Sequence, residues 1–168
     1  MTKLSIVKAK KKGPYIFIVD DDPIYRELIK YELEENNYSK IETYSVGKQC
    51  IENLHKMPDI ILLDNCLDET MDGMEVLRKI KAHNPDIQVI MLSSQDKLKV
   101  AVDSMKRGVY DYVEKNDVAM TRILVLIGRI CKWNNLLREN RKIKKVRIYE
   151  LFGGMTIIII ALYFIFLF

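Results

Sequence analysis

The chain has 168 residues, 49% hydrophobic and 30% charged, so it can form one domain with a core plus one appendage and is not wholly disordered or collagen-like. Its net charge of +4 arises at the ends, since eleven of the 27 Lys and Arg residues lie in residues 1–12 and 138–150. Residues 13–137 hold the other 16 basic residues and 21 of the 23 acidic ones, a net charge of −5, and no nucleic-acid recognition motif accompanies the basic ends. We therefore expect no nucleic-acid partner.

Short apolar runs alternate with helical patterns along most of the chain. Runs typical of strands occupy residues 15–19, 41–44, 60–63, 89–92 and 112–114. Helical patterns occupy residues 24–36, 46–56, 74–82, 98–107 and the stretch from 118 past 137. Strands that alternate with helices form parallel sheets covered on both faces, because the crossovers are right-handed. The sequence predicts an α/β fold with a doubly wound five-stranded parallel sheet.

Apolar residues in the first and last of these helices also support specific expectations. In the first helix, Ile24, Leu28 and Tyr31 recur at helical spacing. In the last helix, Trp133 is expected to be a packing residue, with contact to a partner as the alternative.

Polar side chains follow the strand-like runs where each run ends. Asp20 and Asp21 follow the first run and Asp64 the third, and the fourth and fifth are followed by Ser93 and Lys115. Ligands of such sheets bind at the C-terminal strand ends, so these side chains should converge. Clustered carboxylates need a cation, and hard oxygen ligands favour Mg²⁺. A carboxylate beside Mg²⁺ can attack a phosphoryl group, which the ammonium and the hydroxyl can bind.

Five motifs in this order resemble the signature of response-regulator receiver domains over residues 14–135. They are Ile18-Val19-Asp20-Asp21-Asp22-Pro23, Leu63-Asp64, Met71-Asp72-Gly73, Ser93-Ser94 and Tyr112-Val113-x-Lys115. Several motifs on the expected elements are far more specific than one. The resemblance implies a flavodoxin-like fold and a two-component phosphorelay, with a histidine kinase or phosphotransfer protein as phosphoryl donor. It also implies a domain that is not an enzyme beyond its own phosphorylation and dephosphorylation.

The resemblance assigns a role to each matching residue. Asp64 is the phosphoacceptor and also a Mg²⁺ ligand, Asp21 a direct ligand, and Asp20 a ligand acting through water. Cys66 is a ligand through its main-chain carbonyl oxygen. The same resemblance makes Ser93 and Tyr112 the switch pair, and Ser93 and Lys115 the groups that bind the phosphoryl oxygens.

Two departures from the family pattern fall beside this site. The loop after Asp64 lacks the usual proline and is one residue longer, with the change at Leu67–Thr70. Asn116 stands where the family has a proline joined by a cis bond. A cis bond to a non-proline residue costs about 3 to 4 kcal/mol, so we expect a trans bond and some displacement of Lys115.

Two rival functions remain open on the sequence. The altered loop and Asn116 fit a degenerate receiver that acts as a membrane scaffold without phosphorylation. Asp20-x-Asp22 with Ser93 and Lys115 resembles the motif order of haloacid-dehalogenase-type phosphatases, which would make Asp20 the nucleophile and leave Asp64 without a role.

The ends of the chain are interpreted as an attachment to a membrane. Residues 1–13 form a basic arm, 136–150 a basic helical stalk and 151–168 a charge-free apolar segment. Eighteen helical residues span about 27 Å, close to the roughly 30 Å hydrocarbon core. Cations just before the segment predict a single C-terminal transmembrane helix with the receiver in the cytoplasm. An apolar tail that is buried or prone to aggregation is the alternative. The output partner at the membrane stays unknown, and a homodimer stays open.

Overall fold

The computed structural model describes residues 13–67, 71–94, 105–137 and 139. The chain divides into two compact units, Met1–Gly128 and Arg129–Phe168. The helix predicted at 98–107 lies outside the described residues, except that residues 105–106 are helical. Elements of the first unit position the candidate site.

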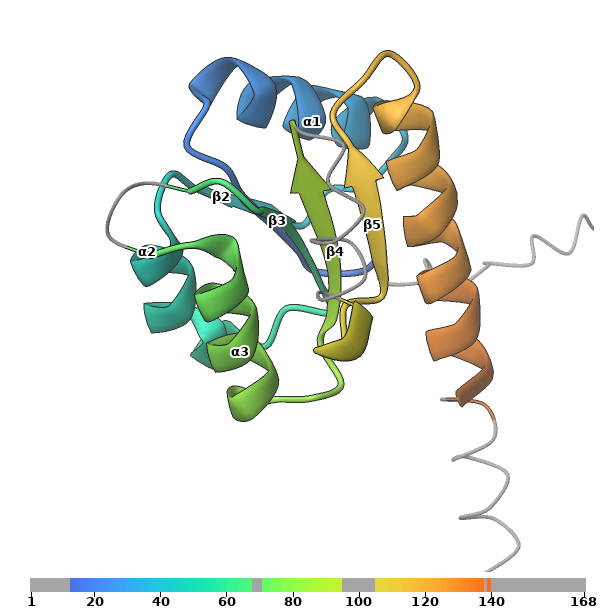
Figure 1. Ribbon diagram of the computed structural model, residues 1–168. Helices are drawn as coiled ribbons and strands as arrows, with labels where there is room; N and C mark the ends of the chain where they lie inside the picture. Colours follow the sequence, from blue (N-terminus) through green and yellow to red (C-terminus); the bar gives the residue numbers. More distant parts are fainter. Residues whose placement is uncertain (1–12, 68–70, 95–104, 138, 140–168) are drawn as a thin grey trace, which may run out of the picture. The chain divides into compact units, whose positions relative to one another are not determined.

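The first unit contains one parallel five-stranded sheet (Figure 1). Its strands are β1 (Ile16–Val19), β2 (Ile41–Tyr44), β3 (Ile60–Asp64), β4 (Gln88–Ser93) and β5 (Asp111–Glu114), in the spatial order β2-β1-β3-β4-β5. Every residue of β1 and β3 is buried. These strands read as unbroken apolar runs because both of their faces are covered, so the predicted parallel α/β sheet is confirmed.

Three described helices follow strands of the sheet. They are α1 (Pro23–Glu35), α2 (Gly47–Glu52) and α3 (Gly73–His83), and a further helix occupies residues 119–137. Asp22 caps α1 by accepting hydrogen bonds from the main-chain nitrogens of Ile24 and Tyr25. Pro23 at the first helical position needs no N–H partner there. The acidic turn after β1 therefore both ends the strand and starts α1.

The predicted helix at residues 46–56 is interrupted. It consists of α2 followed by one 3₁₀ turn, Leu54–Lys56. Asn53 separates the two, and its side-chain amide donates to the main-chain oxygen of Gln49. An asparagine side chain that bonds the backbone of the preceding turn competes with the helical hydrogen-bond pattern.

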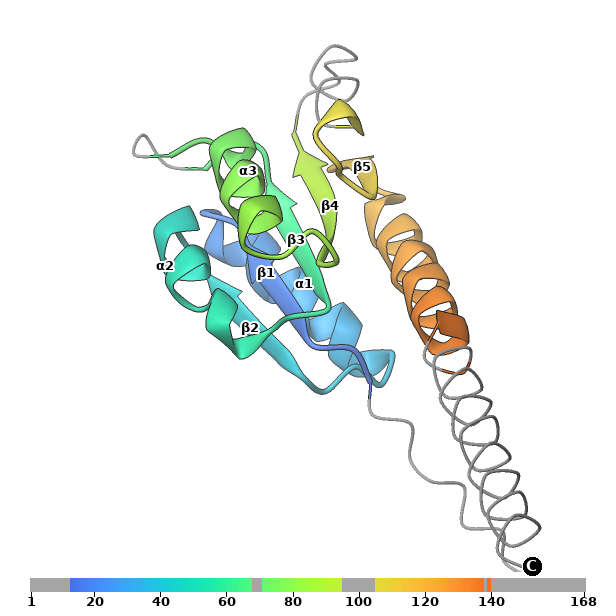
Figure 2. The same cartoon turned by 90° about the horizontal axis from the view of Figure 1, so that it is seen from below.

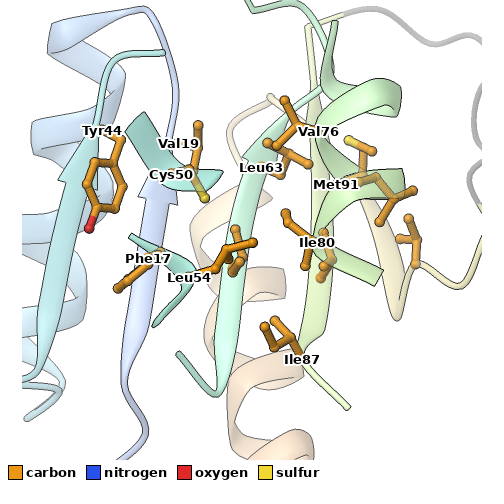
Figure 3. Packing of buried hydrophobic residues seen from close by; sticks show 14 of the residues in the cluster. Phe17, Val19, Tyr44, Cys50, Leu54, Leu63, Val76, Ile80, Ile87 and Met91 are labelled. Carbon is orange, nitrogen blue, oxygen red and sulfur yellow. The ribbon is translucent and has the colours of Figure 1, made fainter. Parts of the chain in front are cut away.

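The two faces of the sheet have different coverings. Phe17, Leu63 and Met91 belong to one buried cluster with Val76 and Ile80 of α3 (Figure 3). In β1, β3 and β4 the even-numbered residues point to the opposite face, because side chains alternate along a strand. The helix α1 lies on that opposite face (Figure 2). The core thus extends on both sides of the sheet.

The buried face of α1 is not the one that carries Ile24, Leu28 and Tyr31. Ile29 and Leu33 are its buried residues, whereas Ile24 is 80% exposed and Tyr31 58% exposed. Leu28 is also exposed, at 44%. Two equally plausible apolar stripes share this helix, and packing on the sheet selects the one at spacing i, i+4.

A polar cluster lies on strand β2. The carboxylate of Glu42 accepts hydrogen bonds from the hydroxyls of Tyr15 and Tyr44, and Lys56 lies 2.7 Å from it. These bonds lower the pKa of Glu42 to about 2 although burial opposes the shift. The ammonium of Lys40 lies 3.6 Å from the centre of the Tyr15 ring. The cluster is a set of satisfied structural contacts.

The second unit is described only through residues 129–137 and 139, all of which are helical. Trp133, expected to pack, is 60% exposed. Most of the predicted stalk at 136–150, all of the segment at 151–168 and nearly all of the arm at 1–13 lie outside the described residues. In the described part of the chain, no helix has the length and apolarity needed to cross a membrane.

Candidate functional site

Three carboxylates meet at the C-terminal edge of the sheet. Val19 pairs with Leu63 across β1 and β3, so the next residues, Asp20 and Asp64, lie side by side. Carboxylate oxygens of Asp20, Asp21 and Asp64 all lie within 4.8 Å of one another. Asp20 is 0% exposed, Asp64 3%, and Asp21 is exposed. The sequence-predicted cluster exists, with two buried members and one that faces solvent.

Lys115 binds both buried carboxylates. Its Nζ lies 2.8 Å from Oδ2 of Asp20 and 2.9 Å from Oδ2 of Asp64, and its side chain is 12% exposed. No cis peptide bond occurs in the described residues, so the bond to Asn116 is trans. The main-chain nitrogen of Lys115 donates to the oxygen of Ser93 at 2.7 Å. This hydrogen bond continues the β4–β5 pairing and keeps the lysine in reach without the family's proline.

Burial and charge act against each other in this cluster. Burial raises the pKa of Asp20, and the carboxylate of Asp64 adds to the rise, although Lys115 opposes it. Burial alone would lower the pKa of Lys115, but hydrogen bonds and charges of the two aspartates outweigh it and raise that pKa. A second cation beside Asp21 and Asp64 would relieve the remaining repulsion. The arrangement can therefore hold a divalent metal with oxygen ligands.

The predicted switch residues are both buried. Ser93 is 2% exposed at the end of β4, one residue after Leu92, which pairs with Asp64. Tyr112 is 9% exposed on β5 and belongs to the core on the α3 side of the sheet. The structure places Ser93 at the edge that carries the carboxylates and Tyr112 two pairs deeper along β4 and β5.

The start of the loop after β3 is held by its backbone. Asn65 donates its main-chain N–H to Leu92 at 2.8 Å, and the N–H of Cys66 donates to Oδ1 of Asp64 at 3.2 Å. Cys66 is therefore next to the cluster, as predicted, and its thiol belongs to an exposed residue. Residues 68–70, which carry most of the altered loop, lie outside the described residues.

Gly73 allows α3 to begin against the end of β3. A Cβ atom at this position would lie 2.3 Å from the main-chain oxygen of Asp64 and 2.7 Å from the Cα of Asn65. Both are backbone atoms, so neither can move aside by rotating a side chain. The glycine of the Met71-Asp72-Gly73 motif is thus required by close approach.

We expect Gly73→Ala to lower the free energy of unfolding by about 3 kcal/mol, because the added methyl overpacks rigid backbone. Urea denaturation of parent and variant measures the loss. Gly128→Ala is the matched control, because a Cβ there meets nothing within 4 Å and alanine favours a helix by about 0.5 to 1 kcal/mol. Equal stability of Gly73→Ala and the parent would contradict the steric argument.

Tyr25 is a site residue that the sequence analysis did not single out. Its ring lies 4.7 Å from Nζ of Lys115, and its hydroxyl is buried without a hydrogen-bond partner among the described residues. Burial raises the pKa of Tyr25. Lys115 opposes this rise, and the carboxylates of Asp20 and Asp64 add to it. An aromatic residue in a first helical turn is ordinary, so no sequence signal marks it.

Known proteins resemble this chain over the same region. The model of the family described as "Response regulator receiver domain" matches residues 16–127. The nitrogen assimilation regulatory protein NtrX of Azorhizobium caulinodans is 34% identical over 132 residues, 78% of this chain and 29% of that protein. The chemotaxis protein CheY of Listeria monocytogenes is 32% identical over 60% of this chain and 84% of its own length.

Solved structures agree with these relatives. A CheY-like response regulator receiver domain protein from Methanospirillum hungatei has a TM-score of 0.64 and 28% identity, and the match covers 76% of this chain and 98% of that one. The chain spans about 30% of the length of the NtrX-type proteins that it matches. Sheet order, strand-end carboxylates and family match coincide on one region, and the chain belongs to the response regulator receiver domain family.

Proposed function

We propose that this receiver accepts a phosphoryl group on Asp64 from the phosphohistidine of a histidine kinase or phosphotransfer protein. The observation that carries the proposal is the contact of Lys115 with both Asp20 and Asp64 at the C-terminal edge of the sheet. In the transfer, the phosphorus–nitrogen bond of the donor breaks as a bond forms to a carboxylate oxygen of Asp64. The leaving imidazole keeps the electron pair and takes up a proton. Beyond this reaction and its reversal by hydrolysis, we expect no enzymatic activity.

Mg²⁺ fits the oxygen donors of the site. Asp20, Asp21 and Asp64 offer three carboxylate groups within 4.8 Å, and Cys66, with its main-chain carbonyl, lies two residues after Asp64. When bound, Mg²⁺ would neutralise the negative charge that the carboxylates and the phosphoryl oxygens bring together. Exposed Asp21 faces the solvent from which a metal and a donor must come.

The remaining site residues have separate tasks in this proposal. Lys115 binds one phosphoryl oxygen by its ammonium, and Ser93 donates a hydrogen bond to another. In this proposal, Ser93 moves toward the phosphoryl group. The movement affects the edge formed by β4 and β5, where Tyr112 is the proposed second switch residue. The signal then passes to an unidentified output partner, which we do not expect to be nucleic acid.

Phosphorylation of the intact protein tests the proposal. Treatment with acetyl phosphate and Mg²⁺ should add one phosphoryl group, and peptide mass spectrometry should map it to Asp64. A group on Asp20 would instead favour the phosphatase reading. No uptake, together with no binding of beryllofluoride and Mg²⁺, would favour the scaffold reading that Asn116 and the altered loop suggested.

Attachment to a membrane is a separate part of the proposal. Residues 151–168 contain no charged residue and follow the cationic stretch 141–147, which supports a single C-terminal span with the receiver in the cytoplasm. These residues lie outside the described part of the structure.

We expect the full chain to stay with the membrane fraction after high-salt and carbonate washes and to be released by detergent. Burial of apolar surface is insensitive to the screening that releases electrostatically bound proteins. A chain truncated after Arg147 should remain soluble and still accept phosphate. Release of the full chain by salt alone would contradict a spanning helix.

A further inference from the structure

Among the described residues, two buried side-chain oxygens have no hydrogen-bond partner, Oδ2 of Asp20 and the hydroxyl of Tyr25. Oδ2 of Asp20 forms an ion pair with Lys115 at 2.8 Å, which leaves the hydroxyl of Tyr25 to be explained. Buried hydroxyls in folded proteins nearly always have a hydrogen-bond partner, so an exception calls for a ligand, a water or an ion. Its place in the fold decides which of these is relevant.

The phenol of Tyr25 belongs to the wall of the phosphoryl site. Tyr25 lies in the first turn of α1, three residues after Asp22, whose carboxylate accepts its main-chain N–H at 3.3 Å. The ring centre is 4.7 Å from Nζ of Lys115. The same Nζ is 2.9 Å from Oδ2 of Asp64, the proposed phosphoacceptor. The unpartnered hydroxyl is therefore carried by a side chain that contacts the group expected to bind phosphate.

The two ends of the side chain suit two different contacts. The ring face attracts an ammonium, which helps to hold Lys115 over the carboxylates. The hydroxyl remains protonated at neutral pH and can donate, while the carboxylates of this site are already engaged by Lys115. A phosphoryl group brings three strong acceptor oxygens into a site with few donors.

We propose that Tyr25 is a further residue of the phosphoryl site, with its ring holding Lys115 and its hydroxyl donating a hydrogen bond to a phosphoryl oxygen on Asp64. The inference rests on the proposed function, because it needs Asp64 to carry the group. It assigns this chain a donor that the five sequence motifs do not include. The buried hydroxyl is then unsatisfied only while the site lacks a phosphoryl group.

The test compares Tyr25→Phe with the parent, both as full chains in mild detergent. Beryllofluoride with Mg²⁺ serves as the probe of the phosphoryl site, with binding followed by ¹⁹F NMR. Loss of one hydrogen bond to a charged group should weaken binding about 10-fold. Tyr31→Phe removes the hydroxyl of an exposed tyrosine on the same helix and should bind like the parent.

Thermal unfolding without beryllofluoride separates this role from a structural one. Tyr25→Phe keeps the ring and removes a buried hydroxyl that has no partner, so its Tm should equal or exceed that of the parent. Tyr25→Leu removes the ring as well and should weaken binding further. A structural role would instead lower the Tm of Tyr25→Phe.

The outcomes distinguish this inference from the proposed function. If the parent binds beryllofluoride and Tyr25→Phe binds equally well, the hydroxyl has no role and the inference is overturned alone. If weaker binding appears only together with a lower Tm, the inference is also overturned. If the parent itself fails to bind, the proposed function and the inference fall together.

Discussion

Asp64→Asn should abolish phosphoryl uptake while the fold is retained. The amide has nearly the same shape as the carboxylate but lacks the nucleophilic oxygen charge, so no aspartyl phosphate can form. It also removes one of two buried negative charges beside Lys115, which still keeps Asp20 at 2.8 Å. The free energy of unfolding should therefore equal or exceed that of the parent. Incorporation of label from acetyl phosphate and urea denaturation measure the two effects.

Asp86→Asn is the matched control, because this exposed aspartate belongs to the same unit and lies in the α3–β4 connection. It should take up label at the rate of the parent. Uptake by Asp64→Asn at that same rate would show that another residue is the phosphoacceptor. Asp20, the nucleophile of the rival phosphatase reading, would then be the first residue to replace.

Lys115→Met should lower the free energy of unfolding by about 3 kcal/mol at pH 7 in the absence of metal. Removing one partner of a buried ion pair leaves the other charge uncompensated, and here two carboxylates lose their shared cation. The methionine fills a similar volume, so packing changes little. Urea denaturation at several pH values measures the loss.

The loss should shrink as the pH falls from 7 toward 4. Burial already raises the pKa of Asp20 in the parent, and without the lysine that pKa rises further. A group with a raised folded-state pKa stabilises the fold when protonated and loses that contribution as the pH rises through the folded pKa. Protonation of Asp20 therefore restores stability at low pH.

Lys79→Met provides the control for this pH series. Its Nζ lies 3.1 Å from Glu75 on the surface of α3, with both side chains more than a third exposed. Such pairs contribute at most about 0.5 kcal/mol, so little change is expected at any of these pH values. Equal stability of Lys115→Met and the parent at pH 7 would contradict the electrostatic account of the site.

The strand order along the chain and the polar residues at the strand ends follow from the sequence. Parallel strands buried on both faces appear as short unbroken apolar runs, and each run here is followed by a polar residue. The runs before Asp20 and Asp64 differ from the observed strands by one residue at most. Local composition is sufficient for these features because burial imposes it residue by residue.

Helix faces and helix ends could not be read in the same way. Both Ile24-Leu28-Tyr31 and Ile29-Leu33 satisfy helical spacing on α1, and only packing on the sheet buries the second set. The interruption at Asn53 likewise depends on its side-chain amide, which donates a hydrogen bond to the main-chain oxygen of Gln49. Competing local preferences of similar strength are decided by the tertiary contacts that each one permits.

The candidate site shows most clearly which features the sequence determines and which features need the tertiary structure. The sequence by itself determined which residue types reach the sheet edge, since Asp20, Asp64 and Lys115 each follow an apolar run. Only the tertiary structure decided that Lys115, with a trans bond to Asn116, still binds both carboxylates, and that the ring of Tyr25 lies beside it. Lys115 and Asp64 are 51 positions apart, so the distance between them depends on strand register and helix packing, which no short stretch of sequence encodes.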